Sequence, residues 1–93
     1  MTVVRHYRIT GRVQGVGYRD WCVDVARGLG VAGWVRNVRA DRSVEALAAG
    51  SHDALAQFEA ECRRGPRLAR VDAVAVEASD ERPVAGFVRA PDG

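Results

Sequence analysis

Apolar residues recur with two different periods along this chain, and the order of these periods limits the fold. In residues 3–13 they alternate with polar residues, with Tyr7, Ile9 and Val13 on one side. This period of two is typical of a strand with one buried face. In residues 20–29 the apolar positions, among them Trp21 and Cys22, are spaced as on one face of a helix. Residues 3–29 therefore predict a strand followed by a helix.

The rest of the chain continues in the same manner. Residues 31–37 and 43–50 predict a second and a third strand joined by a hairpin, and Ser51 can cap a second helix that runs to about Arg64. Residues 71–78 predict a fourth strand, and residues 86–90 a short fifth one. The order β-α-β-β-α-β favours an α+β fold, a ferredoxin-like sandwich in which two helices cover one face of an antiparallel sheet.

Length and charge bound the class of protein. The 93 residues suffice for one domain, expected to span residues 1–93, and no linker or low-complexity segment divides them. The net charge of +2 gives no electrostatic reason to bind nucleic acid or an acidic membrane surface. No apolar run has the length of a signal peptide or a membrane span, so a cytoplasmic protein is expected. All 14 basic residues are arginines, which excludes lysine-based chemistry.

The two cysteines lack the spacing of a zinc or redox motif. Cys22 and Cys62 each lie on the apolar face of a predicted helix. Two reduced, buried thiols are the favoured interpretation. A disulfide between the two helices is the geometrically possible alternative.

The segment VQGVGYR, residues 13–19, joins the first strand to the first helix and indicates an anion site. Gly15 and Gly17 allow positive φ angles, so that successive backbone N–H groups can point into one concavity. The start of the following helix adds its unpaired N–H groups. The positive charge of Arg19 is unfavourable beside the positive end of the helix dipole. A bound dianion would make the charge favourable. A plain strand-to-helix turn is the alternative.

Asn37 ends the second predicted strand. In the predicted fold the first two strands run in the same direction, so their carboxyl ends meet at one edge of the sheet. Asn37 is therefore expected on the same rim as residues 14–19. Its amide could hold a water molecule in line with a bound phosphorus. Alternatively, the amide could open the hairpin turn.

Taken together, GRVQGVGYR, GWVRN and DRSVEALAAG resemble the acylphosphatase family, and the later GPRLARVDAV and GFVR agree with it, over residues 7–89. The resemblance implies hydrolysis of acyl phosphates to a carboxylate and inorganic phosphate, without metal or other cofactor. It implies that Arg19 binds the phosphate and that Asn37 positions the water. It also implies a cradle formed by the backbone of Gln14, Gly15, Val16, Gly17 and Tyr18. The family usually has Asp-Gly at the hairpin tip, where this chain has Asp41-Arg42, so the turn type is open.

A small-molecule acyl phosphate is the expected partner, without nucleic acid or membrane, and the chain is expected to be a monomer. Neither His6 nor His52 is expected at the rim, so the phosphate of the substrate would accept the proton. Asp20 is expected to face solvent in the first helical turn; the alternative is that it points inward and weakens anion binding. One alternative is a binding module that holds a phosphate-bearing ligand or RNA without turning it over. Against RNA, the open sheet face lacks the usual aromatic residues. A metal carrier is the other alternative, opposed by the absence of paired cysteines.

Overall fold

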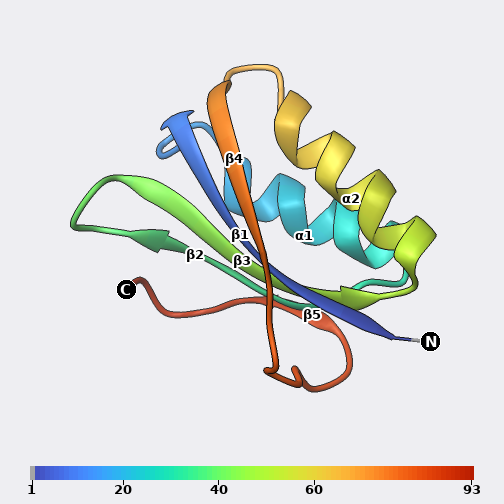
Figure 1. Cartoon of the computed structure of the whole chain (residues 1–93). Coiled ribbons are helices and arrows are strands. Elements are labelled where there is room, and N and C mark those ends of the chain that lie inside the picture. The colour runs from blue at the N-terminus through green and yellow to red at the C-terminus, as the bar shows by residue number, and fades with distance from the viewer. Residues whose placement is uncertain (1) are drawn as a thin grey trace.

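The alternating segments form strands and the helically spaced segments form helices, in the predicted order (Figure 1). The structure is a computed structural model that describes residues 2–93, so the predicted domain boundary at residue 1 lies outside it. The elements are β1 (Val3–Arg12), α1 (Tyr18–Gly28), β2 (Ala32–Val38), β3 (Ser43–Gly50), α2 (His52–Arg64), β4 (Arg70–Ala78) and β5 (Phe87–Arg89).

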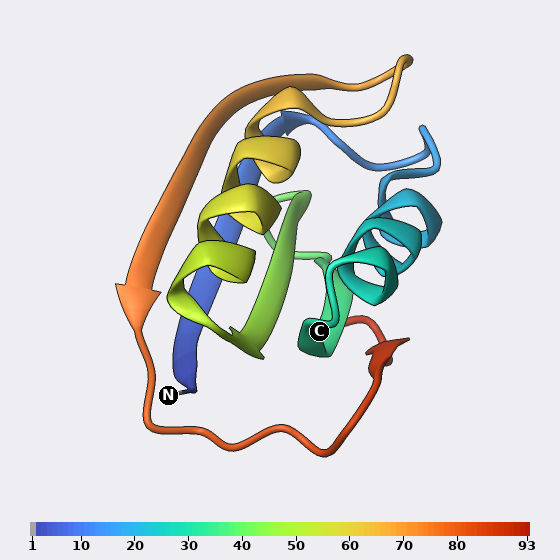
Figure 2. The same cartoon turned by 90° about the vertical axis from the view of Figure 1, so that its right-hand side faces the viewer.

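Within residues 2–93 the strands form one sheet in the order β4-β1-β3-β2-β5, and both helices cover the same face of it (Figure 2). The four strands β1 to β4 pair in antiparallel fashion, as predicted. The short strand β5 instead pairs in parallel with β2, which makes the sheet mixed. The cause is the connection from β4, which passes along one end of the sheet to the opposite edge before β5 begins (Figure 2).

The core lies between the sheet and the two helices. Tyr7, Ile9 and Val13 are all buried, as the alternation in β1 predicted. The ring of Phe58 on α2 lies 5.4 Å from that of Tyr7 and 5.8 Å from that of Phe87, measured between centroids. Phe58 thereby packs α2 against β1 near the centre of the sheet and against β5 at its edge.

Helix α1 begins at Tyr18, two residues before the predicted start, and the buried ring of Tyr18 fixes its rotation. The Tyr18 hydroxyl donates a hydrogen bond to the backbone oxygen of Cys62 on α2, at 2.7 Å. Burial raises the pKa of Tyr18 far above its usual value, so the hydroxyl remains a donor. Trp21, expected on the apolar face, is only partly buried against the core, and Val23 is buried in addition.

Cys22 on α1 and Cys62 on α2 are both free and buried. A hydrogen bond to Cys62, together with burial, raises the pKa of the Cys22 thiol well above its usual value. The favoured interpretation, two buried thiols, is the one observed, and the alternative disulfide is not formed. Among residues 2–93, no helix is both long enough and apolar enough to cross a membrane.

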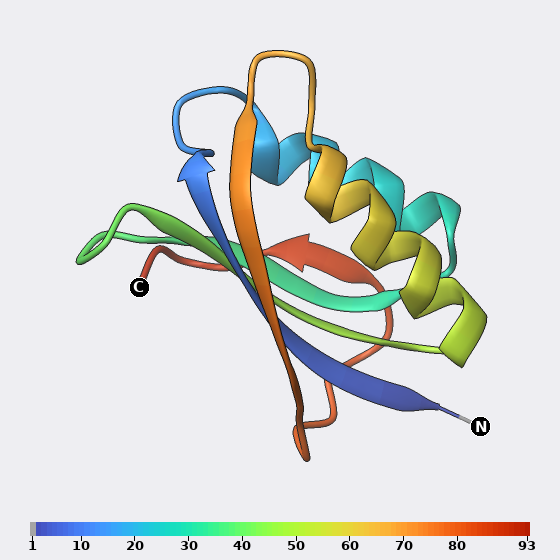
Figure 3. The ribbon, with the colours of Figure 1, turned by 45° about the horizontal axis from the view of Figure 1, so that its top comes forward.

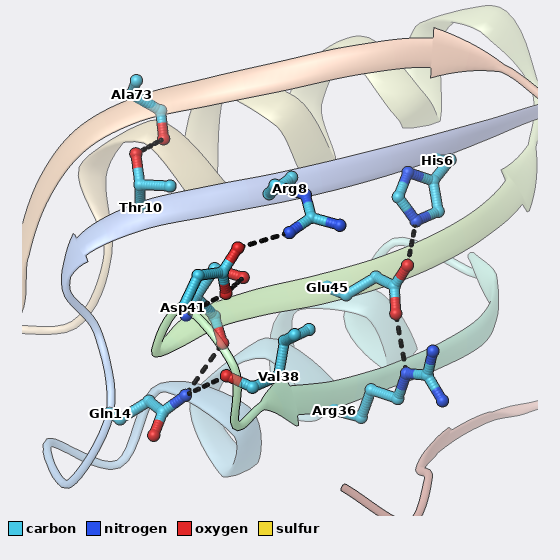
Figure 4. Close-up of polar contacts among 10 residues, drawn as sticks. His6, Arg8, Thr10, Gln14, Arg36, Val38, Asp41, Glu45 and Ala73 are labelled. Carbon is cyan, nitrogen blue, oxygen red and sulfur yellow. Dashed lines mark hydrogen bonds and ion pairs between the residues drawn. The ribbon is translucent and has the colours of Figure 1, made fainter. Parts of the chain in front are cut away.

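The structure gives the backbone conformation of the hairpin turn between β2 and β3, which the sequence left open. Residues 39–42 form the connection, and Arg42 has a φ of 61°, in the left-handed region that favours glycine. The carboxylate of Asp41 accepts hydrogen bonds from the backbone N–H of Ser43 at 3.0 Å and from its hydroxyl at 2.6 Å. It also pairs with Arg8 on β1 at 2.6 Å (Figure 4). These contacts, those with Ser43 above all, lower the pKa of Asp41.

Candidate functional site

The candidate site lies where β1 and β2 end and α1 begins, at one end of the sheet (Figure 3). A cavity of about 90 Å³ is lined there by Val13, Gly15, Gly17, Tyr18, Arg19, Asp20, Asn37 and Arg89. The segment between β1 and α1 thus shares one cavity with Asn37, which follows it by about twenty residues in the sequence. This is the juxtaposition that the predicted strand order required.

The backbone of the loop turns at two glycines with positive φ angles. Gly15 and Gly17 have φ angles of 73° and 79°. A Cβ atom at either position would meet nothing within 4 Å, so glycine is needed for the backbone angle rather than for space. Gly17 is also the N-cap of α1 and provides no side-chain acceptor for the first N–H groups of the helix. These N–H groups are therefore available to an anion.

The side chains of Gln14 and Val16 anchor the loop and do not line the cavity. The side-chain amide of Gln14 donates hydrogen bonds to the backbone oxygens of Val38, at 3.2 Å, and Ser43, at 2.9 Å (Figure 4). Val16 packs against the core. The loop is thus fixed to the β2–β3 hairpin, one residue beyond Asn37. Of the five predicted cradle residues, Gly15, Gly17 and Tyr18 line the cavity.

Arg19 lies in the first turn of α1 and already holds a carboxylate. Its Nη1 donates to Oδ1 of Asp92 at 3.0 Å, and the two side chains are 26% and 29% exposed. Backbone hydrogen bonds from Ala90 to Val35 and from Gly93 to Asn37, both 2.9 Å, keep the segment with Asp92 beside β2. Arg19 can therefore bind oxyanions from the position it occupies.

Asn37 is buried, with 8% of its surface exposed, and its side-chain oxygen accepts no hydrogen bond from residues 2–93. Asn37 pairs with Val44 inside the sheet, and the hairpin connection begins two residues later. The hairpin therefore does not use its amide in the way the alternative interpretation proposed. A buried acceptor without a donor costs about 1–3 kcal/mol, so this oxygen is suited to receive a hydrogen bond from a molecule in the cavity.

A second ion pair borders the cavity. Nη1 of Arg89, the last residue of β5, donates to Oδ1 of Asp20 at 2.7 Å. Asp20 is largely exposed, as expected, but it also lines the cavity, where Arg89 balances its charge. Sequence reasoning identified neither Arg89 nor Asp92 as part of the site. No local pattern marks them, because only the pairing of β5 and the following residues with β2 places them beside α1.

The two histidines lie outside the cavity lining, as expected. His6 on β1 bonds Oε2 of Glu45 through Nε2 at 2.5 Å, on the open face of the sheet (Figure 4). The other oxygen of Glu45 accepts a hydrogen bond from Nε of Arg36 at 2.6 Å. His52 is the first residue of α2 and is exposed.

Comparison with known proteins identifies the family. The family model described as Acylphosphatase matches residues 5–88. The chain belongs to the acylphosphatase family. It is 59% identical to the acylphosphatase of Nitrobacter hamburgensis over 83 residues, which are 89% of this chain and 78% of that one. It is 50% identical to the acylphosphatase of Acidiphilium cryptum over 92 residues, 98% of this chain and 99% of that one.

The fold agrees with solved acylphosphatase structures. The structure of an acylphosphatase from Coxiella burnetii superposes with a TM-score of 0.90 at 28% identity, over 96% of this chain and 93% of that one. The family predicted from the motifs and the ferredoxin-like fold predicted from the order of the elements are therefore confirmed. The roles of individual residues in the cavity stay predictions.

Proposed function

We propose that this chain hydrolyses acyl phosphates to a carboxylate and inorganic phosphate, with Arg19 and Asn37 as its catalytic residues. The observation that carries the proposal is the cavity that Arg19, the glycine-bearing loop and Asn37 line together, in which the side-chain oxygen of Asn37 accepts no hydrogen bond from residues 2–93. The acylphosphatase family membership supports the same reaction. The two free thiols, Cys22 and Cys62, fit a reducing compartment, and we propose a cytoplasmic enzyme.

In this proposal, Arg19 and the backbone of Gln14–Tyr18 bind the phosphoryl oxygens. The guanidinium can contact two of these oxygens, and the N–H groups of the loop and of the first helical turn contact the others. Because these donors are fixed before substrate arrives, they stabilise the charge that develops on the phosphoryl group in the transition state. The phosphate replaces Asp92 on Arg19, and partly exposed pairs of this kind contribute only about 0–1 kcal/mol.

Asn37 then positions the attacking water. Its Oδ1 accepts a hydrogen bond from the water and holds it in line with phosphorus, on the side opposite the carboxylate. The water oxygen forms a bond to phosphorus while the bond from phosphorus to the carboxylate oxygen breaks. The carboxylate leaves without a general acid because it is a weak base. The proton of the water passes to a phosphoryl oxygen, since no histidine lines the cavity and Arg89 holds the carboxylate of Asp20.

Hydrolysis of benzoyl phosphate, followed by absorbance with a chelator present, tests this proposal. Arg19→Ala should lose both phosphate binding and turnover, because it removes the main cation of the site. Asn37→Ala should bind inorganic phosphate like the wild type but lose about 100-fold or more in kcat, since only the positioning of water is removed.

The matched control is Arg70→Ala. Arg70 lies on β4, at the sheet edge opposite β5, in an exposed pair with Asp72. This variant loses the same charge and should retain wild-type turnover. A folded wild type that binds phosphate without hydrolysing benzoyl phosphate would refute the enzymatic role and leave an anion-binding module.

A further inference from the structure

A groove of about 320 Å³ between α1 and β5 adjoins the candidate phosphate cavity, and the mechanism above does not use it. Its lining consists of Asp20, Val23, Asp24, Arg27, Val88 and Arg89. Asp20 and Arg89 line both the groove and the phosphate cavity, so their ion pair lies on the border between the two. A substrate whose phosphate occupies the cavity can extend its acyl group past this pair into the groove.

The strand geometry directs Arg89 toward that border. Arg89 pairs with Val35 in the parallel ladder between β5 and β2. Because side chains alternate along a strand, Arg89 lies on the same face of β5 as the buried Phe87, toward the helices. Asn37 likewise lies on the same face of β2 as the buried Val35. Arg89 and Asn37 thus approach the start of α1 from neighbouring strands.

Arg89 already binds a carboxylate at this border, and that carboxylate is replaceable. The Asp20 oxygen lies 2.7 Å from Nη1 of Arg89, but the two side chains are 73% and 44% exposed. Exposed pairs contribute at most about 1 kcal/mol, so a carboxylate from a ligand can take the place of Asp20 at little cost. The other arginine of the groove, Arg27, donates its Nε hydrogen to the backbone oxygen of Phe87 at 3.2 Å.

We propose that Arg89 selects acyl phosphates whose acyl group carries a second anionic group. This anion displaces Asp20 from Arg89, while the carbon atoms between it and the phosphate lie at the border between the cavity and the groove. Arg89 is then a specificity-determining residue that binds the acyl group and not the transferred phosphoryl group. The inference rests on the proposed hydrolysis for the location of the phosphate.

The kinetic test compares succinyl phosphate with its methyl ester, which has nearly the same shape but lacks the terminal charge. The wild type should prefer succinyl phosphate by about fivefold in kcat/KM, with the difference in KM, because the contact is made equally in the ground and transition states. Arg89→Gln should abolish this preference. Asp20→Asn should increase it, since the competing carboxylate is gone. Arg70→Gln, a charge loss at the opposite sheet edge, should keep the wild-type preference.

Each of three results would overturn the proposal. One is a preference for succinyl phosphate that persists in Arg89→Gln. Another is a loss of inorganic phosphate binding in Arg89→Gln as large as that in Arg19→Ala, which would make Arg89 a ligand of the phosphate. The third is that Arg89→Gln and Asp20→Asn change the kinetics of both substrates alike, which would show that the ion pair is purely structural.

Calorimetric binding of two stable phosphonates separates this proposal from the proposed hydrolysis. One is a carboxyalkyl phosphonate, and the other is the alkyl phosphonate of equal length. If the wild type hydrolyses no acyl phosphate but prefers the carboxylated phosphonate through Arg89, the specificity proposal stands and the enzymatic one fails. If hydrolysis occurs and neither phosphonate is preferred, the enzymatic proposal stands and the specificity proposal fails. If neither phosphonate binds, the assignment of Arg89 is wrong.

Discussion

Arg42 has a backbone conformation that favours glycine, although it carries a long side chain. Its φ of 61° lies in the left-handed region, where a Cβ atom costs roughly 1–2 kcal/mol. The hydrogen bonds that Asp41 accepts from Ser43 hold the neighbouring turn in shape. The chain thus keeps a backbone suited to glycine while carrying arginine.

Replacing Arg42 with glycine should therefore stabilise the protein. We expect a gain of about 0.5–1 kcal/mol in the free energy of unfolding, because the relief of strain exceeds the extra freedom of glycine in the unfolded chain. Urea denaturation measures this difference. Arg39→Gly, in the same connection but without a positive φ, is the control and should destabilise. A loss of stability in Arg42→Gly would show that the arginine side chain contributes more than its backbone costs.

Asp92 competes with phosphate for Arg19, because its carboxylate pairs with Arg19 where phosphate is proposed to bind. Asp92→Asn removes the competing negative charge, so we expect inorganic phosphate to bind about two- to fivefold more tightly, as measured by calorimetry. Asp80→Asn removes the same charge from a residue outside the cavity lining and should leave the affinity unchanged. Weaker binding in Asp92→Asn would instead identify Asp92 as a residue that orients Arg19.

At the scale of elements, one carboxylate connects three strands across the open face of the sheet. Glu45 on β3 accepts hydrogen bonds from His6 on β1 and Arg36 on β2 (Figure 4). Burial acts to raise the pKa of Glu45, but the bonds from His6 and Arg36 outweigh it, and the net shift is downward from 4.5. The ionised carboxylate therefore stabilises the folded state.

This lowered pKa predicts how stability depends on pH. Glu45 contributes its full stabilisation above its unfolded pKa of 4.5, and the contribution disappears as the pH falls through the lower folded value. Glu45→Gln should cost about 1–3 kcal/mol near neutral pH and progressively less in acid. Urea denaturation at pH values from neutral to about 3 measures the free energy of unfolding of the wild type and of Glu45→Gln. A difference that stays constant over this range would contradict the role of the charge.

At the scale of the whole molecule, the candidate site is assembled from distant parts of the chain. The glycine-bearing loop, Asn37 and Arg89 meet because β2 runs parallel to β1 with β3 between them, and β5 joins beside β2. The first of these relations follows from the order of strands and helices, so the shared cavity of Arg19 and Asn37 could be expected. The second depends on where the segment after β4 returns to the sheet, and no periodicity in the sequence encodes that path.

The sequence by itself therefore determined the elements, their order, the buried face of β1 and the family. These follow from the spacing of apolar residues, from Gly15 and Gly17, and from motifs that are local in the chain. Tertiary structure alone decided the rotation of α1, the conformation of Arg42, and the ion pairs that Asp92 and Asp20 make with Arg19 and Arg89. The physical reason is that these features depend on contacts between residues far apart in the chain. No spacing of residues along the sequence indicates such contacts.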